Sequence, residues 1–177
     1  MRRSRTNRRR ERQLLTWYPT MASKELVYAD ALVGEVTQDV LTVVHLDAIV
    51  EHEAVLERTR GSVVAFSVNT SIHQLIVAGC VVERKLADVM TQATANVPDL
   101  LNTDDGDDYF FWQSFACVDN TTSNYWNGRE IDVKAKRRIE RGDAIVYLAK
   151  ARLLNNQGTG TEKIEIGLNV RHLFRFN

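Results

Sequence analysis

Apolar and polar residues alternate through the last fourteen residues of the chain. The even positions from Ile164 to Phe176 are apolar except for His172, and most of the odd positions are polar. A period of two is typical of a strand with one buried face, whereas a helix would spread these apolar residues around its circumference. The pattern therefore predicts a long, half-buried strand over these residues.

Shorter segments with the same character are also predicted to be strands. They are Thr42–Val50, Gly61–Val68, Gln74–Glu83, Tyr109–Val118, Glu130–Lys136 and Asp143–Leu154. The third is continuously apolar, as expected of a strand buried on both faces. Only Glu83–Ala95 is predicted to be a helix, with Leu86, Val89, Met90 and Ala93 at helical spacing. Residues 21–40 fit neither pattern.

The connections between these strands are long and polar, which suits Greek-key crossings better than tight hairpins. Seven or eight strands with such connections predict an all-β fold, an antiparallel jelly-roll sandwich of about eight strands. We assign residues 21–177 to this single domain and residues 1–20 to a flexible basic arm.

Charge divides the chain into two parts of opposite sign. Seven of the first twelve residues are arginine: Arg2, Arg3, Arg5, Arg8, Arg9, Arg10 and Arg12. With Glu11 the arm carries +6, and the remaining 16 basic and 22 acidic residues carry −6. A block of like charge repels itself and needs a polyanion, and arginine matches phosphate geometry well. The arm is thus predicted to bind nucleic acid; a solubility tail or a nuclear-import signal is the alternative.

A second basic cluster follows the predicted strand at Glu130–Lys136. Its members are Lys134, Lys136, Arg137, Arg138 and Arg141, with Glu140 among them. The cluster either contacts nucleic acid beside the arm or forms a solvated turn with local ion pairs.

Other candidate sites are weaker. The loop with Asp104, Asp105, Asp107 and Asp108 lacks the spacing of a calcium loop, so we predict no metal site and no cofactor. His45, His52, His73 and His172 form no ligand motif, and His45 and His172 are expected to be satisfied core or rim residues. Trp17, Tyr125 and Trp126 are expected to make subunit contacts or to cap the sandwich, with stacking on bases as the alternative. Cys80 and Cys117 are expected to be free and buried.

The sequence also bears on membranes and catalysis. The longest apolar run, residues 75–82, is too short to span a bilayer, so no membrane partner is expected. No nucleophile elbow, phosphate loop or dinucleotide fingerprint is present in the sequence, and we expect no enzyme activity.

Several blocks resemble capsid proteins of circular Rep-encoding single-stranded DNA (CRESS-DNA) viruses. They are the arginine-rich arm, Glu57–Gly61 leading a strand, the aromatic Asp108–Trp112, the block Ile131–Asp143 and the final strand. The resemblance departs ahead of the aromatic strand, where such proteins often have several prolines and this chain has only Pro98.

The resemblance implies a jelly-roll capsid subunit without enzyme activity. Sixty copies would close a T=1 icosahedral shell around a single-stranded DNA genome, in the virion, with assembly in the host nucleus and contact with import receptors. Sixty arms would carry roughly 360 positive charges, fewer than the 531 nucleotides needed to encode 177 residues. Small cations or a second basic surface must therefore contribute.

Two other functions remain open from the residues. One is a cellular nucleic-acid-binding β-domain with a basic tail, although such proteins usually carry basic charge on the folded body as well. The other is a cupin-like jelly-roll enzyme or binding module, which would need converging histidines and a carboxylate that the spacing here does not suggest. DNA and RNA are not distinguished, because arginine recognises phosphate and not sugar.

Overall fold

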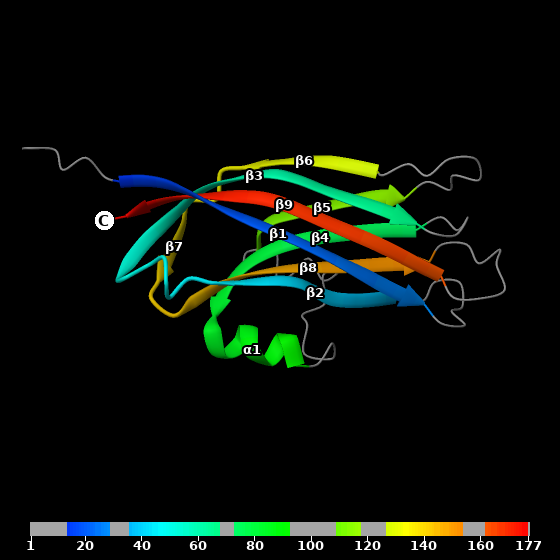
Figure 1. Ribbon diagram of the computed structural model, residues 1–177, viewed down its shortest axis with the longest axis horizontal. Helices are drawn as coiled ribbons and strands as arrows, with labels where there is room; N and C mark the ends of the chain where they lie inside the picture. The colour runs from blue at the N-terminus through cyan, green and yellow to red at the C-terminus, as the bar shows by residue number, and fades with distance from the viewer. Residues whose placement is uncertain are drawn as a thin grey trace, which may run out of the picture.

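The computed structural model describes residues 14–28, 36–67, 73–92, 109–117, 127–153 and 162–176. In chain order its elements are β1 (Leu14–Tyr28), β2 (Val36–His45), β3 (Glu53–Ser67), β4 (His73–Glu83), α1 (Arg84–Gln92), β5 (Tyr109–Cys117), β6 (Asn127–Val133), β7 (Arg137–Glu140), β8 (Asp143–Leu153) and β9 (Glu162–Phe176). Figure 1 shows the strands in two layers, with α1 below one of them.

Two antiparallel sheets face each other. One has the strand order β1-β9-β3-β6, with β7 also pairing with β3, and the other has the order β2-β8-β4-β5. The pairs are nested: the first long strand pairs with the last, β2 with β8, β3 with β6 and β7, and β4 with β5. The chain changes sheets between β1 and β2, β2 and β3, and β3 and β4. This is the jelly-roll fold, and the predicted fold class is confirmed.

The alternating residues of β9 form one buried face and one outward face, as predicted. Every even residue from Ile164 to Phe174 is buried, and the odd residues face outward with intermediate or full exposure. Because β9 lies between β1 and β3, its inward side chains fill the space between the sheets. Burying one such apolar side chain contributes about 1.5–3 kcal/mol, so this strand is a main source of cohesion.

The two central strands of the second sheet are buried on both faces. Residues 75–80 of β4 and 144–151 of β8 are all buried. One face packs on the first sheet, and on the other face Ile76, Val146 and Leu148 pack with Ala87 and Met90 of α1. The helix thus explains why the predicted strand Gln74–Glu83 is continuously apolar.

The helix presents a different face from the one predicted. It begins at Arg84 and is described to Gln92, and the predicted residues 93–95 lie outside the described part of the chain. Ala87 and Met90 are buried against the sheet, whereas Leu86 and Val89 of the predicted apolar stripe are 47% and 44% exposed. A small residue at Ala87 allows close approach of the helix, which the apolar count alone does not reveal.

Several predicted strand boundaries were wrong. Strand β2 ends at His45, and residues 46–50 form a turn in which Val50 N donates to Leu46 O at 2.8 Å. Strand β6 ends at Val133, before the predicted end at Lys136. Residues 14–20, assigned to the arm, lie in β1, and β7 was not predicted. The division of the chain into arm and domain stays a prediction.

Candidate nucleic-acid interface

The seven arginines of the arm lie outside the described residues, but the point where the arm leaves the body is defined. Strand β1 begins at Leu14, which pairs with Phe176 of β9; Phe176 pairs with Ala54 of β3, and Ala54 with Ile139 of β7. Adjacent strands lie about 4.8 Å apart, so this row spans roughly 14 Å. The root of the arm and β7 therefore share one end of the sandwich, the end that also holds the C-terminus (Figure 1).

The second basic cluster lies at this same end. Lys134 and Lys136 are in the connection between β6 and β7, Arg137 and Arg138 are in β7, and Arg141 follows it in the turn to β8. In that turn Gly142 has φ 93°, a left-handed conformation that glycine adopts without strain. All five are exposed except Arg137, which is intermediate.

Contacts within the subunit divide these five residues. The Arg138 guanidinium lies 3.1 Å from Glu53 and 3.4 Å from Glu140, and Arg137 donates to the carbonyl oxygen of Tyr109 at 3.4 Å. These two arginines attach β7 to its neighbours. Lys134, Lys136 and Arg141 have no ion-pair partner among the described residues. We call these three the exposed basic triplet; they are the side chains that a polyanion could neutralise.

Two neighbouring arginines already share one carboxylate. On the outer face of the first sheet, Arg58 donates to both carboxylate oxygens of Asp132, at 2.5 and 2.6 Å, and Arg60 lies 3.3 Å from the same carboxylate. The hydrogen bond from Arg58, assisted by Arg60, lowers the pKa of Asp132 to about 2. Asp132 offsets one of the two positive charges, so this pair offers less to a phosphate than the exposed basic triplet does.

The histidines show no metal site. Among the described residues no group of three or more His, Cys, Asp or Glu side chains could hold a metal ion. His45 and His52 are exposed, whereas His172 is fully buried and contacts Thr59 Oγ1 through Nδ1 at 3.1 Å. His73 lies on β4, but its side chain is outside the description, as are Asp104, Asp105, Asp107 and Asp108.

The aromatic and cysteine predictions are tested in part. Trp17 lies on the outer face of β1, 38% exposed, with the Arg171 guanidinium 5.2 Å from its ring centroid. Tyr125 and Trp126 lie outside the described residues. Cys80 is free and buried, as predicted, and the side chain of Cys117 is not described. In the described part of the chain no helix combines the length and apolar character needed to cross a membrane.

Sequence reasoning missed the apolar outer face of β1. Leu15, Met21 and Val27 are 57%, 76% and 44% exposed. The sequence carried a signal, because these large apolar residues all stand at odd positions. The alternation was unclear because inward residues such as Tyr18 and Leu26 are apolar as well.

Comparisons with known proteins support the fold. Neither a protein-family profile nor a curated protein matches the sequence. Among solved structures, a chain in the structure of infectious bursal disease virus, Gx strain, is similar with a TM-score of 0.50 and 9% identity. The match covers 93% of this chain and 32% of the viral chain, so this chain spans about a third of that length. A Desmodium yellow mottle tymovirus chain matches at a TM-score of 0.31 and 11% identity, over 88% of both chains.

Proposed function

We propose that this chain is a viral capsid protein that assembles with copies of itself into a closed shell and packages nucleic acid through its arginine-rich arm. A jelly-roll body is suited to this function because it is a rigid wedge whose connections lie at its two ends. The fold that it shares with a chain of infectious bursal disease virus supports the proposal.

The observation that carries the proposal is the position of the arm's root. Leu14 lies at the end of the sandwich where β7 and the exposed basic triplet also lie. An arm of net charge +6 and three further cations then face one region, while the rest of the body has an acidic excess. Such a subunit has one end for a polyanion and leaves its other surfaces for contacts with neighbours.

The finer parts of the proposal rest on the resemblance to CRESS-DNA virus capsid proteins. They are a shell of sixty copies, a single-stranded DNA genome, location in the virion, and assembly in the host nucleus with help from import receptors that read the arm. Binding by one arm is weak at physiological salt, and many arms on one shell bind strongly through effective concentration.

Electron microscopy of the purified chain tests the shell. We expect uniform closed particles, and nuclease treatment of the extracted contents should identify single-stranded DNA. A chain that stays monomeric at high concentration and moderate salt would contradict the capsid function. Particles containing only RNA would keep the capsid function and remove the DNA assignment.

Deleting residues 1–12 tests the arm. Because the deletion ends before β1, the body should keep its circular dichroism and melting temperature, while the nucleic acid per particle should fall severalfold. Replacing the seven arginines by lysine is the matched control, since it keeps the charge and loses only the guanidinium forks. Truncated particles with as much nucleic acid as intact ones would show that the arm does not package the genome.

A further inference from the structure

The outer face of the first sheet carries exposed apolar side chains along its edge strand. On β1, Trp17, Met21 and Val27 are 38%, 76% and 44% exposed, whereas Tyr18 and Ala22 pack inward against the core. The helix α1 covers the other sheet. A row of large apolar residues on one strand exceeds the scattered exposure of ordinary surfaces and marks a contact site.

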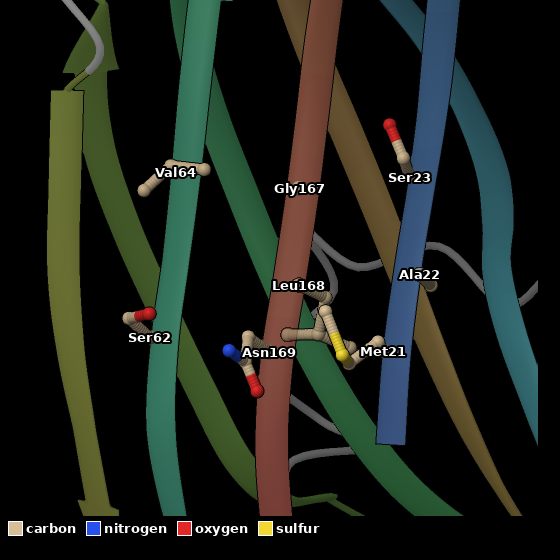
Figure 2. A pocket seen from close by; sticks show the side chains of 8 residues that line it. All are labelled: Met21, Ala22, Ser23, Ser62, Val64, Gly167, Leu168 and Asn169. Atoms are coloured by element: carbon tan, nitrogen blue, oxygen red, sulfur yellow. The ribbon is translucent and has the colours of Figure 1, made fainter.

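A groove lies beside this row. Figure 2 shows Met21 reaching from β1 toward β9, beside Leu168 and Asn169. The groove has a volume of about 390 Å³, and Ser23, Val64 and Asn169 also line it. Its floor is open because Gly167 has no side chain; a Cβ there would lie 3.0 Å from Val64 Cγ2. The protruding Met21 thus forms one side of this hollow.

Strand β9 carries a positive and a negative side chain at equal distances on either side of Leu168. Arg171 lies three residues after Leu168 and Glu165 three residues before it, with Asn169 and Gly167 as the outward residues between them. Ala22 is the β1 partner of Leu168. Trp17 lies five residues before Ala22 and Val27 five residues after it, so the face is nearly symmetric about these two residues.

The other charges of β1 and β9 on this face are paired within the same chain. Lys163 lies 3.1 Å from Glu25, and Arg175 lies 2.6 Å from Glu57. Arg171 contacts the Trp17 ring, and among the described residues neither Arg171 nor Glu165 has an ion-pair partner. On β1 and β9, one positive and one negative charge are thus left, at equal distances from the centre of the face.

We propose that this face packs against the same face of a second copy, about a twofold axis that crosses the strands beside Ala22 and Leu168. About this axis the two copies of β9 are antiparallel. Arg171 of one copy therefore lies opposite Glu165 of the other, and Glu165 of the first copy lies opposite Arg171 of the second. Met21 then lies over Ser23 and fills the groove at Gly167 of the second copy, and Trp17 meets Val27.

Each of these contacts occurs twice, as an isologous interface requires. Face-to-face packing of two sheets with nearly aligned strands is an ordinary arrangement. The inference deepens the proposed function and rests on it in one respect: a shell needs contacts between copies, and this is one of them.

A charge exchange in the full-length, nuclease-treated chain tests the pairing. Glu165→Arg and Arg171→Glu each place like charges opposite one another twice, so each variant alone should self-associate at least about tenfold more weakly than the unmodified chain. Mixing the two variants restores both opposite-charge pairs, so the mixture should form heterodimers where each variant alone stays monomeric. Sedimentation velocity and native mass spectrometry measure both.

Two control variants change the same charges elsewhere. Glu51→Arg and Lys85→Glu alter exposed residues in a turn and on α1, and both should self-associate as the unmodified chain does. Met21→Ser tests the apolar part and should also weaken the dimer. Folding of every variant is checked by its melting temperature.

The outcomes separate this contact from the capsid function. If Glu165→Arg leaves the dimer constant unchanged, or the mixture fails to restore association, the contact is overturned, even where particles still form. If the dimers respond to the exchange as expected but no particles ever form, the contact stands and the capsid function falls.

Discussion

His172 is the buried residue with the largest consequence for pH dependence. Its ring lies between the sheets, with its centroid 5.8 Å from that of Tyr147 on β8 and Nδ1 bonded to Thr59 on β3. Neither His172 Nε2 nor the Tyr147 hydroxyl has a hydrogen-bond partner among the described residues. Burial lowers the pKa of His172 to about 4 and raises that of Tyr147. No carboxylate is among the buried residues of the described chain, so a protonated His172 would lack compensation.

We expect the body to lose stability as the pH falls from about 6.5 to about 4. The pKa of His172 is lower in the folded state, so the stabilisation is complete above the unfolded pKa and is lost as the pH falls to the folded one. The loss should reach about 3 kcal/mol of unfolding free energy. Urea unfolding of the unmodified chain and of His172→Leu across this range measures it.

The control for this prediction is His45→Gln, because His45 is exposed. This variant should keep the pH dependence of the unmodified chain, and His172→Leu should lose most of it between pH 6.5 and 4. The lowered pKa of Asp132 acts below this window, since its contribution is lost as the pH falls from 3.8 toward 2. Equal pH dependence in the His172→Leu variant and the unmodified chain would contradict the assignment.

At the scale of the strands, the sequence predicted those elements whose two faces differ. Strand β9 has one apolar face, and β4 is apolar on both because α1 covers it. Strand β1 was missed because several of its outward residues are large and apolar, which weakens the alternation that identifies a strand. The exposed apolar side chains of β1 thus explain both why the strand was missed and why we propose a contact between copies there.

The ends of the strands were less predictable from the sequence, because they depend on contacts with residues that are distant in the chain. Leu46 and Val50 are apolar like the strand before them, yet they fill the core from a turn that is held by the Leu46 N to Asp143 O hydrogen bond. In the candidate site, composition identified the arm and the second cluster. It did not reveal that Arg138 is neutralised by Glu53, 85 residues away in the sequence.

The pairing of β3 with β9 depends on one glycine. A Cβ at Gly61 would lie 2.0 Å from the backbone oxygen of Asn169, so the two strands could not keep their spacing. Gly61→Ala should therefore destabilise the body by at least about 3 kcal/mol in urea unfolding. Gly128→Ala is the matched control, because its Cβ would meet only Val64 Cγ1 at 3.5 Å. Equal stability of the two variants would contradict the register of these strands.

At the scale of the whole molecule, charge separates two tasks. The arm carries +6 and the remainder of the chain −6, so in the proposed shell the acidic remainder would discourage nucleic acid from coating the outer surfaces. The arms of sixty copies could not neutralise even the nucleotides that encode this chain. Positive side chains on the folded body near the root of the arm would neutralise some of the remaining phosphates. The exposed basic triplet lies at that place.

The dependence of binding on salt measures how many of these cations contact phosphate. For a single strand each neutralised phosphate contributes about −0.7 to the slope of log K against log salt, so seven arginines give a slope near −5. If Lys134, Lys136 and Arg141 also bind, the intact chain should show a slope near −7, and replacing all three by glutamine should return it to about −5. Fluorescence anisotropy with a labelled oligonucleotide measures the slope.

Arg138→Gln separates contact with phosphate from support of the fold. Because Arg138 is held by Glu53 and Glu140, its loss should lower the melting temperature slightly and leave the slope unchanged. Deleting residues 1–12 should leave a slope near −2 from the exposed basic triplet alone. A slope of −5 in both the intact chain and the triple variant would confine nucleic-acid binding to the arm, and the end of the sandwich would then serve only to direct the arm toward the genome.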